Sequence, residues 1–279
     1  PAGFTPTYTF TGLVSGDTDA SLSHAGSAYN TKDVVTADKV TVSGLSISGI
    51  TGDKSSAATD YVLDNASKDV AATITAKTVS LEAAKTYDGT TGLTGAVTLG
   101  TGISGESLNY TGATANDAHV VTANKYINAI TLTDGTGSAS NYQLPALNNT
   151  NAPVTINAAT LTPTLSNTGV TKVYDGTTDA PAGFTPTYTF TGLVSGDTAA
   201  SLSNTSAAYN DKDVADANKV TVSGLSISGI TGDKSSAATD YVLDNASKDV
   251  AADISAKPIT ISKITAANKV YDATTNATT

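Results

Sequence analysis

The chain of 279 residues contains no cysteine, methionine or tryptophan, and aromatic residues make up only 6% of it. The absence of cysteine excludes disulfides, thiolate nucleophiles and cysteine-ligated zinc. All 15 basic residues are lysines, so arginine, the usual bidentate ligand of phosphates and guanine edges, is also absent. Because the formal net charge is −10, the chain is expected to be repelled by nucleic acids and by anionic membranes. We therefore expect no nucleic-acid binding.

The sequence also lacks an apolar run long enough to span a membrane, a signal peptide and a lipidation motif. We expect no membrane insertion by this segment. Because the chain opens with Pro1 in the middle of a repeat, we expect it to be a piece of a longer protein. The missing targeting signals therefore say nothing about where that protein resides.

A catalytic constellation is missing as well. The two histidines have no common site, because His24 is replaced by Asn204 in the near-identical copy and His119 belongs to a different repeat. The only glutamates, Glu82 and Glu106, both lie in that divergent repeat. A general base needs a nucleophile and an orienting group beside it, and no such set recurs. We predict that the protein is not an enzyme, with no catalytic and no cofactor-binding residues.

What the sequence does contain is a long internal duplication. Residues 1–72 recur at 181–252 with nine differences, all between Asp19 and Asp38. A more divergent copy lies between them, so the offset of 180 residues covers two repeats. Such a pattern indicates tandem domains, each packed against its neighbours.

The expected domains follow from the recurring segments. We predict a repeat at 1–76 that lacks its first strand, a divergent repeat at 77–158, a repeat at 159–256 nearly identical to the first, and the first strands of a further repeat at 257–279. The joins carry no flexible Gly/Ser linker, which favours a stiff connection between neighbouring repeats.

The local pattern is that of β-strands. In Thr7–Thr11 the aromatic residues share one face and the threonines the other, as in a half-buried strand. The alternation of apolar residues changes parity at Gly44, where we expect a β-bulge. Pro163 predicts a strand at a sheet edge, and Ser56–Asp60 is compatible with a single helical turn. We predict an all-β fold of tandem Greek-key or Ig-like β-sandwich repeats that form an elongated rod.

Three short motifs punctuate the repeats. The first is Tyr-Asp-Gly-Thr-Thr, the second is a Gly-acid-hydroxyl step such as Gly16-Asp17-Thr18, and the third is a Tyr preceded by Asp or Asn, such as Tyr61. The first motif comprises Tyr87, Asp88 and Gly89, then Tyr174, Asp175 and Gly176, and a variant with Tyr271, Asp272 and Ala273. Its Asp is a conceivable ligand for a cation or a sugar hydroxyl. We favour a structural role, in which the Tyr is buried and the Asp and Gly form a turn.

Two binding alternatives stay open at this point. Asp211, Asp213 and Asp216 offer the oxygen ligands that calcium prefers, but the first copy has Thr31, Asp33 and Thr36 there. A solvated acidic surface is therefore the favoured interpretation, and we predict no metal site. Rows of outward-facing threonines are compatible with binding of host or matrix glycans or of ice, although threonine is also simply a good strand former.

The last residues resemble the first strands of a repeat that the chain does not complete. Ile259, Ile261, Val270 and Tyr271 are the apolar positions of these candidate strands. A strand from this segment is a candidate to complete the first repeat of another chain, which would join identical chains head to tail.

The recurring Lys-x-Tyr-Asp-Gly-Thr-Thr segment, followed by a Gly-rich β unit that ends in Asn/Asp-Tyr-x-Leu, resembles the YDG domain repeat. The resemblance covers essentially the whole chain and departs from the motif at Ala273. Such repeats occur in large bacterial surface exoproteins of the filamentous-haemagglutinin, two-partner-secretion type. The resemblance implies an extracellular stalk or adhesin segment at a bacterial cell surface and implies no catalytic residues.

We therefore expect a structural segment that gives an adhesin or surface filament its reach in cell-surface, matrix or biofilm attachment, with neighbouring repeats as its main partners. The alternatives are a filament subunit that polymerises by β-strand donation and a glycan-, ice- or calcium-binding module.

Overall fold

The computed structural model describes residues 4–277 and has an all-β fold, as the sequence predicts. Within this range the only helices are 3-10 helices of a single turn. The chain forms two compact units. Unit 1 contains the residues up to Lys85 together with Thr91–Ala118 and Thr122–Ile156, and unit 2 contains Thr86–Thr90, His119–Val121 and the residues from Asn157 onward. No helix in the described part of the chain is both long and apolar enough to cross a membrane.

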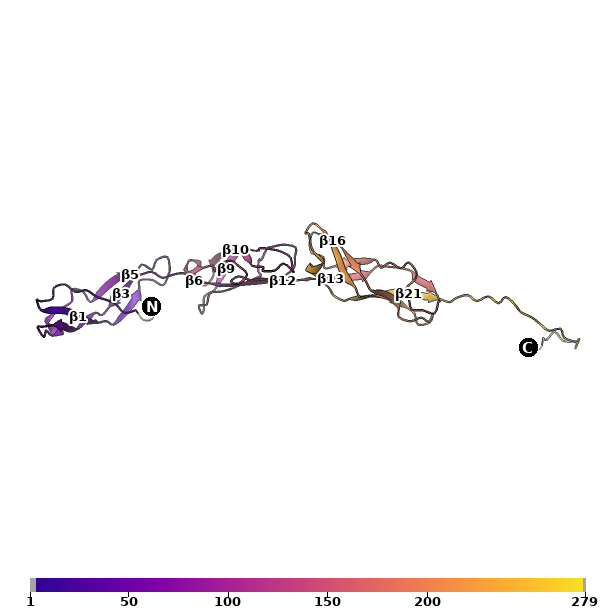
Figure 1. Cartoon of the computed structure of the whole chain (residues 1–279), viewed down its shortest axis with the longest axis horizontal. Helices are drawn as coiled ribbons and strands as arrows, with labels where there is room; N and C mark the ends of the chain where they lie inside the picture. Colours follow the sequence, from indigo (N-terminus) through magenta and orange to yellow (C-terminus); the bar gives the residue numbers. More distant parts are fainter. Residues whose placement is uncertain (1–3, 278–279) are drawn as a thin grey trace. The chain divides into compact units, whose positions relative to one another are not determined.

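The first repeat, in unit 1, consists of two small antiparallel sheets. One pairs β1 with β4, and the other has the order β2-β3-β5. Strands β1, β3 and β5 are labelled in Figure 1. The elements are β1 (Asp17–Ser23), β2 (Gly26–Tyr29), β3 (Lys39–Ser43), β4 (Ser46–Gly52), the 3-10 helix η1 (Ala58–Asp60) and β5 (Ser67–Ala71). Val40 and Val42 on β3 are 2% and 3% exposed, so alternate side chains of this strand form the core.

The parity change at Gly44 has a different cause from the β-bulge that we expected. Strand β3 ends at Ser43 and β4 begins at Ser46, and the two strands belong to different sheets. Gly44 has φ +62°, and a Cβ there would lie 2.5 Å from the Cβ of Ala25. The inward face therefore changes because the chain passes from one sheet to the other, at a residue that only glycine suits.

The second repeat has three pairings. Strands β9 and β10 form an antiparallel pair, β12-β7-β8 form a sheet, and β6 pairs with β11 in parallel. The elements are β6 (Lys77–Thr78), β7 (Ser80–Thr86), β8 (Val97–Gly100), β9 (Leu108–Ala115), β10 (Ile127–Asp134), η2 (Ala139–Asn141), β11 (Tyr142–Gln143) and β12 (Val154–Asn157). Leu93 and Ile127 are 0% exposed and lie in its core.

The third repeat, in unit 2, has the most complete set of strands. Its sheets have the orders β15-β13-β20, β14-β21-β18-β17 and β16-β19. The elements are β13 (Ala159–Leu165), β14 (Val170–Val173), β15 (Tyr188–Thr191), β16 (Asp197–Ser203), β17 (Ser206–Tyr209), β18 (Lys219–Ser223), β19 (Ser226–Gly232), η3 (Ala238–Asp240), β20 (Tyr241–Leu243) and β21 (Ser247–Ser255). Its core is centred on Val220 and Val222, both 0% exposed.

Strand pairing decides whether the same sequence forms a strand. The segment Tyr188–Thr191 is strand β15 because it pairs with β13, whereas the identical segment at 8–11 is not a strand. Likewise β21 extends to Ser255 beside β14, whereas β5 ends at Ala71. The predicted strand at Thr7–Thr11 is therefore wrong for the first repeat and correct for its copy.

The prediction of an edge strand at Pro163 is also wrong for the strand as a whole, because β13 lies between β15 and β20. The pairing with β20 covers only Ala159–Leu161, however, while Pro163 is paired with Phe190 of β15. The proline, which has no N–H to donate, thus lies just beyond the end of one of the two ladders.

Residues 257–277 contain no strand. Ile259, Ile261, Val270 and Tyr271, the apolar positions of the expected strands, are 75–90% exposed. Like the segment at 8–11, this one carries a strand pattern without a partner strand beside it.

Candidate functional site

An acid–tyrosine pair recurs in every repeat and joins two of the sequence motifs. In the third repeat the hydroxyl of Tyr241 donates to Asp197 Oδ2 at 2.5 Å, and Ser236 donates to the same oxygen at 2.6 Å. The Tyr241 hydroxyl also accepts the N–H of Val194 at 3.0 Å. Burial and the hydrogen bond to Asp197 hold the pKa of Tyr241 far above its usual range, so its hydroxyl stays a donor.

The first and second repeats have the same pair. Tyr61 donates to Asp17 Oδ2 at 2.7 Å, and Tyr142 donates to Glu106 Oε2 at 2.6 Å. Hydrogen bonds from Ser56 and Tyr61 lower the pKa of Asp17 below its usual value. These pairs connect the Gly-acid-hydroxyl step of each repeat to the tyrosine that follows its 3-10 turn. We regard them as structural because each carboxylate accepts a hydrogen bond from a hydroxyl of its own repeat.

The Tyr-Asp-Gly-Thr-Thr motifs form turns. Asp175 Oδ1 accepts the N–H of Thr177 at 2.9 Å and the ammonium of Lys172 at 2.8 Å. The Lys172 contact, followed by that of Thr177, lowers the pKa of Asp175 to about 2. Gly176 has φ +82°, a left-handed conformation that glycine adopts without strain.

The other two copies of the motif have the same local geometry in different surroundings. Asp88 accepts the N–H of Thr90 at 2.9 Å, and Asp272 accepts that of Thr274 at 2.9 Å. Gly89 has φ +73°, and Ala273 takes a similar left-handed conformation at φ +56°. The tyrosines differ in burial, because Tyr87 is 2% exposed, Tyr174 is half-buried and Tyr271 is 89% exposed.

Within unit 1, a loop of the first repeat contacts the 3-10 turn of the second. The N–H of Val34 donates to Asn141 Oδ1 at 2.8 Å, and Asn141 Nδ2 donates to Asp33 Oδ1 at 2.9 Å. The side-chain amide of Asn141 thus uses its acceptor and its donor on consecutive residues of one loop.

Unit 2 contains an equivalent contact at the aligned positions. The N–H of Val120 donates to Asp240 Oδ1 at 2.7 Å, and His119 Nδ1 lies 2.7 Å from Asp240 Oδ2. Because a carboxylate only accepts, the histidine nitrogen is the donor. Asp240 is 0% exposed and also accepts the N–H of Ala237 at 2.8 Å.

Aromatic contacts surround this second contact. Tyr87 shares a hydrogen bond of 2.6 Å with Ser236 and packs edge-on against Tyr241, with ring centroids 5.7 Å apart. The ring of His119 stacks on Tyr87 at 6.1 Å. Tyr87, the tyrosine of the first Tyr-Asp-Gly-Thr-Thr motif, is therefore packed against the acid–tyrosine pair of the third repeat.

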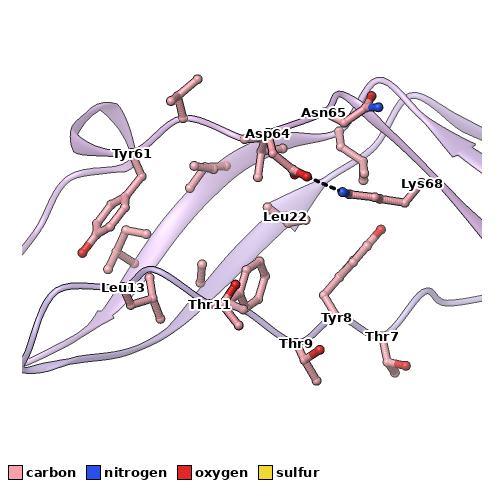
Figure 2. Close-up of a pocket in the computed structure, with 17 residues that line it drawn as sticks. Thr7, Tyr8, Thr9, Thr11, Leu13, Leu22, Tyr61, Asp64, Asn65 and Lys68 are labelled. Carbon is pink, nitrogen blue, oxygen red and sulfur yellow. Dashed lines mark hydrogen bonds and ion pairs between the residues drawn. The ribbon is translucent and has the colours of Figure 1, made fainter.

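An open groove of about 520 Å³ lies on the first repeat (Figure 2). Residues Thr7–Leu13 form one wall, and Tyr61–Lys68 form the opposite wall. In Figure 2, Tyr8 points into the groove beside Leu22, whereas Thr7 and Thr9 point away from it. In the third repeat the copies of these walls are β15 and β20, and strand β13 lies between them.

Side-chain exposure shows how much β13 covers. Lys68 and Asp64 are ion-paired at 2.7 Å within one wall of the groove (Figure 2). Their side chains are 51% and 78% exposed. The matching pair in the third repeat, Lys248 and Asp244, is 18% and 30% exposed. The groove is therefore the position of a strand equivalent to β13.

The three acidic residues considered as calcium ligands do come together. The carboxylate groups of Asp211, Asp213 and Asp216 lie within 4.8 Å of one another. Asp213 is ion-paired with Lys212 at 2.8 Å, and its own N–H is bound by Asp211. A lysine within the cluster offsets part of its charge. The prediction of no metal site stays a prediction here, with calcium binding as the alternative.

Comparison with known proteins identifies a YDG domain at residues 155–248. This range includes Tyr174, Asp175 and Gly176, the motif that suggested the resemblance. No curated protein and no solved structure matches the chain. This match identifies the domain at these residues and does not identify a class of secreted protein.

Two features were not predicted from the sequence. The acid and the tyrosine of each pair were recognised as separate motifs, and their recurrence together in every repeat is the signal that links them. The loop contacts of Asn141 and Asp240 join residues that are 107 and 120 positions apart in the sequence. The one signal for them in the sequence is that the loop residue and the turn residue change together, from Asp33 with Asn141 to His119 with Asp240.

Proposed function

We propose that the chain is a structural stalk segment of an extracellular bacterial adhesin or surface filament, in which YDG-type repeats give reach for cell-surface, matrix or biofilm attachment. The observation that carries the proposal is the repeated contact between a loop and the following 3-10 turn. It involves the same aligned positions in each unit, Val34 with Asn141 and Val120 with Asp240. A recurring contact between successive repeats is what a stacked array requires.

The hydrogen bonds of the recurring polar side chains support the same proposal. The polar side chains that recur in all repeats bind one another within or between repeats, and the tyrosine hydroxyls and acids of the motifs are engaged in this way. Arrays of this kind spread their stability over repeats and over the contacts that join them.

Small-angle X-ray scattering of the full chain tests the stalk. A compact globule of 279 residues has a radius of gyration of about 19 Å, and an unfolded chain about 59 Å. We expect an intermediate value with the pair-distance distribution of an elongated particle. A value near either limit would contradict the proposal. Antibody labelling of unbroken source cells tests the location separately, and absence of label from the surface would contradict the extracellular assignment.

The open groove favours a second candidate function, assembly of identical chains head to tail by strand donation. By alignment with the third repeat, Ile259 takes the place of Leu161 of β13, which is 0% exposed. Ile261 takes the place of Pro163, and Thr260 that of the outward Thr162. The segment thus has the apolar alternation that the groove accommodates in the copy.

Light scattering of the full chain over a range of concentrations tests strand donation. We expect concentration-dependent oligomers that the double substitution Ile259→Asp and Ile261→Asp abolishes. The matched control, Thr260→Asp with Ser262→Asp, adds the same charge on the outward face and is expected to leave assembly intact. A chain that stays monomeric at the highest concentration, or two variants that behave alike, would contradict this function.

A further inference from the structure

The two loop-to-turn contacts have the same hydrogen bond from a backbone N–H and a different hydrogen bond between side chains. In both, the N–H of a valine donates to Oδ1 of the last residue of a 3-10 turn, Asn141 or Asp240. The residue before each valine, Asp33 or His119, faces the second polar atom of that turn residue. The aligned loops have no insertion or deletion between them, so these are the same positions with different occupants.

The occupants are chemically matched. Asp33 accepts a hydrogen bond and faces the donor Nδ2 of Asn141, whereas His119 donates and faces the acceptor Oδ2 of Asp240. Exchanging only one partner removes the match. An aspartate in place of Asn141 would bring two carboxylate oxygens to about the 2.9 Å that now separates Asp33 Oδ1 from an amide nitrogen, and like charges at that distance cannot both remain ionised.

We propose that this pair of positions determines which type of repeat can follow which. A repeat with Asp in the loop is followed by a repeat with Asn in the turn, and a repeat with His in the loop is followed by one with Asp in the turn. The inference concerns the choice of neighbour and holds whether or not the array serves as a stalk.

The rule explains the alternation of repeats. The first repeat has Asp33 in its loop and Asp60 in its turn, and the third has Asp213 and Asp240. Two repeats of this type in succession would place two carboxylates face to face, with one of them as deeply buried as Asp240, which is 0% exposed. The second repeat, with His119 and Asn141, is complementary to this type on both sides. Near-identical copies are therefore separated by a divergent repeat, at the observed offset of 180 residues.

The same rule defines the partners of the two remaining positions. The turn of the first repeat, ending in Asp60, fits a loop of the His119 type. The loop of the third repeat, with Asp213, fits a turn of the Asn141 type. In each case the partner surface is another repeat, of the second type, in the same or another chain.

The test is a compensated exchange in the full chain. Asn141→Asp recreates the mismatched pair in unit 1, and adding Asp33→His converts it into the pair that unit 2 uses. The readout is hydrogen exchange of the Val34 amide, followed by NMR, because that N–H donates across the contact. We expect exchange to be about tenfold faster in the single variant, the factor equivalent to 1.4 kcal/mol, and to return to within about threefold of the original rate in the double variant.

A second exchange gives an independent measurement in unit 2. His119→Asp is expected to speed exchange of the Val120 amide, and Asp240→Asn is expected to restore part of the protection. The restoration is partial because Asp240 Oδ2 also accepts the N–H of Ala237, and the Nδ2 that would replace this oxygen is a donor and cannot accept it. The matched controls are Asp60→Asn and Asp213→His, the same substitutions at aligned positions outside both contacts, and they are expected to leave both amides unchanged.

Unchanged exchange at Val34 in Asn141→Asp would overturn the proposal. So would a double variant that stays as fast as the single variant while its circular dichroism is native, because the contact would then depend on shape and not on the match. Faster exchange in the control variants would assign the effect to charge in general and would equally overturn it.

Discussion

Replacing Tyr241 by phenylalanine is expected to lower the free energy of unfolding of the third repeat by about 2–4 kcal/mol. The substitution keeps the ring, which is 5% exposed, and removes only the hydroxyl. That hydroxyl donates to Asp197 Oδ2 at 2.5 Å and accepts the N–H of Val194 at 3.0 Å. A hydrogen bond to a charged group contributes about 1.5–3 kcal/mol, and the unpaired N–H adds about 1 kcal/mol. Asp197 keeps its bond from Ser236, which limits the total.

The near-identical first repeat supplies the matched control. Tyr61 has the same partners, with Asp17 at 2.7 Å and the N–H of Val14 at 3.0 Å, but it is only half-buried. Water can replace its hydroxyl, so Tyr61→Phe is expected to cost about 1 kcal/mol. The direct hydrogen-bond partners of the two hydroxyls are the same, so the comparison tests the effect of the surroundings, in which Tyr87 packs against Tyr241.

Native-state hydrogen exchange by NMR measures both costs, from the amides of β16 and β19 for Tyr241→Phe and from those of β1 and β4 for Tyr61→Phe. NMR is needed because identical peptides from the two repeats have equal masses. Equal costs in the two repeats would refute the argument from burial. A cost below about 0.5 kcal/mol for Tyr241→Phe would refute the structural role of the pair itself.

Three further predictions concern the turns, the core and acid stability. Gly176→Ala is expected to lower the free energy of unfolding by about 1 kcal/mol in a denaturant titration. Its new Cβ meets open space, so only the φ of +82° opposes the substitution. The control Gly229→Ala, at a glycine without a positive φ, is expected to lower this free energy by less. Leu161→Ala, at a side chain that is 0% exposed, is expected to cost about 2–5 kcal/mol by the same titration. The pKa of Asp175 is lowered in the folded state from 3.8 to about 2, so its contribution is complete above pH 4 and lost as the pH falls toward 2. Asp175→Asn is expected to flatten the acid limb of the stability curve over that interval, and an unchanged limb would contradict the assignment.

The all-β fold and the turns were predictable because their determinants are local. Gly89 and Gly176 follow an aspartate in a turn motif, and both have the positive φ that such a turn requires. The single helical turn expected within Ser56–Asp60 is η1. These features depend on the chemistry of four or five consecutive residues, which the sequence displays directly.

Strand formation was predictable only as a tendency. The segment at 8–11 and strand β15 have the same sequence and differ in outcome because only β15 has β13 beside it. Similarly, the alternation around Gly44 correctly indicated a change of inward face but not its cause, a transfer between two sheets. A strand is stabilised by hydrogen bonds to a neighbour, and a neighbour distant in the sequence is not visible in a local pattern.

The contacts between repeats were the hardest to predict, yet the sequence variation is consistent with them. The differences between the first and third repeats include Thr31/Asp211 and Val35/Ala215, on either side of the contacting loop residues, and none of the altered positions is buried in the first repeat. Asp33 and Val34 between them are the same in both copies, as Asp213 and Val214. Identity at the two contacting residues, amid differences on both sides, agrees with the proposed requirement for a matched neighbour.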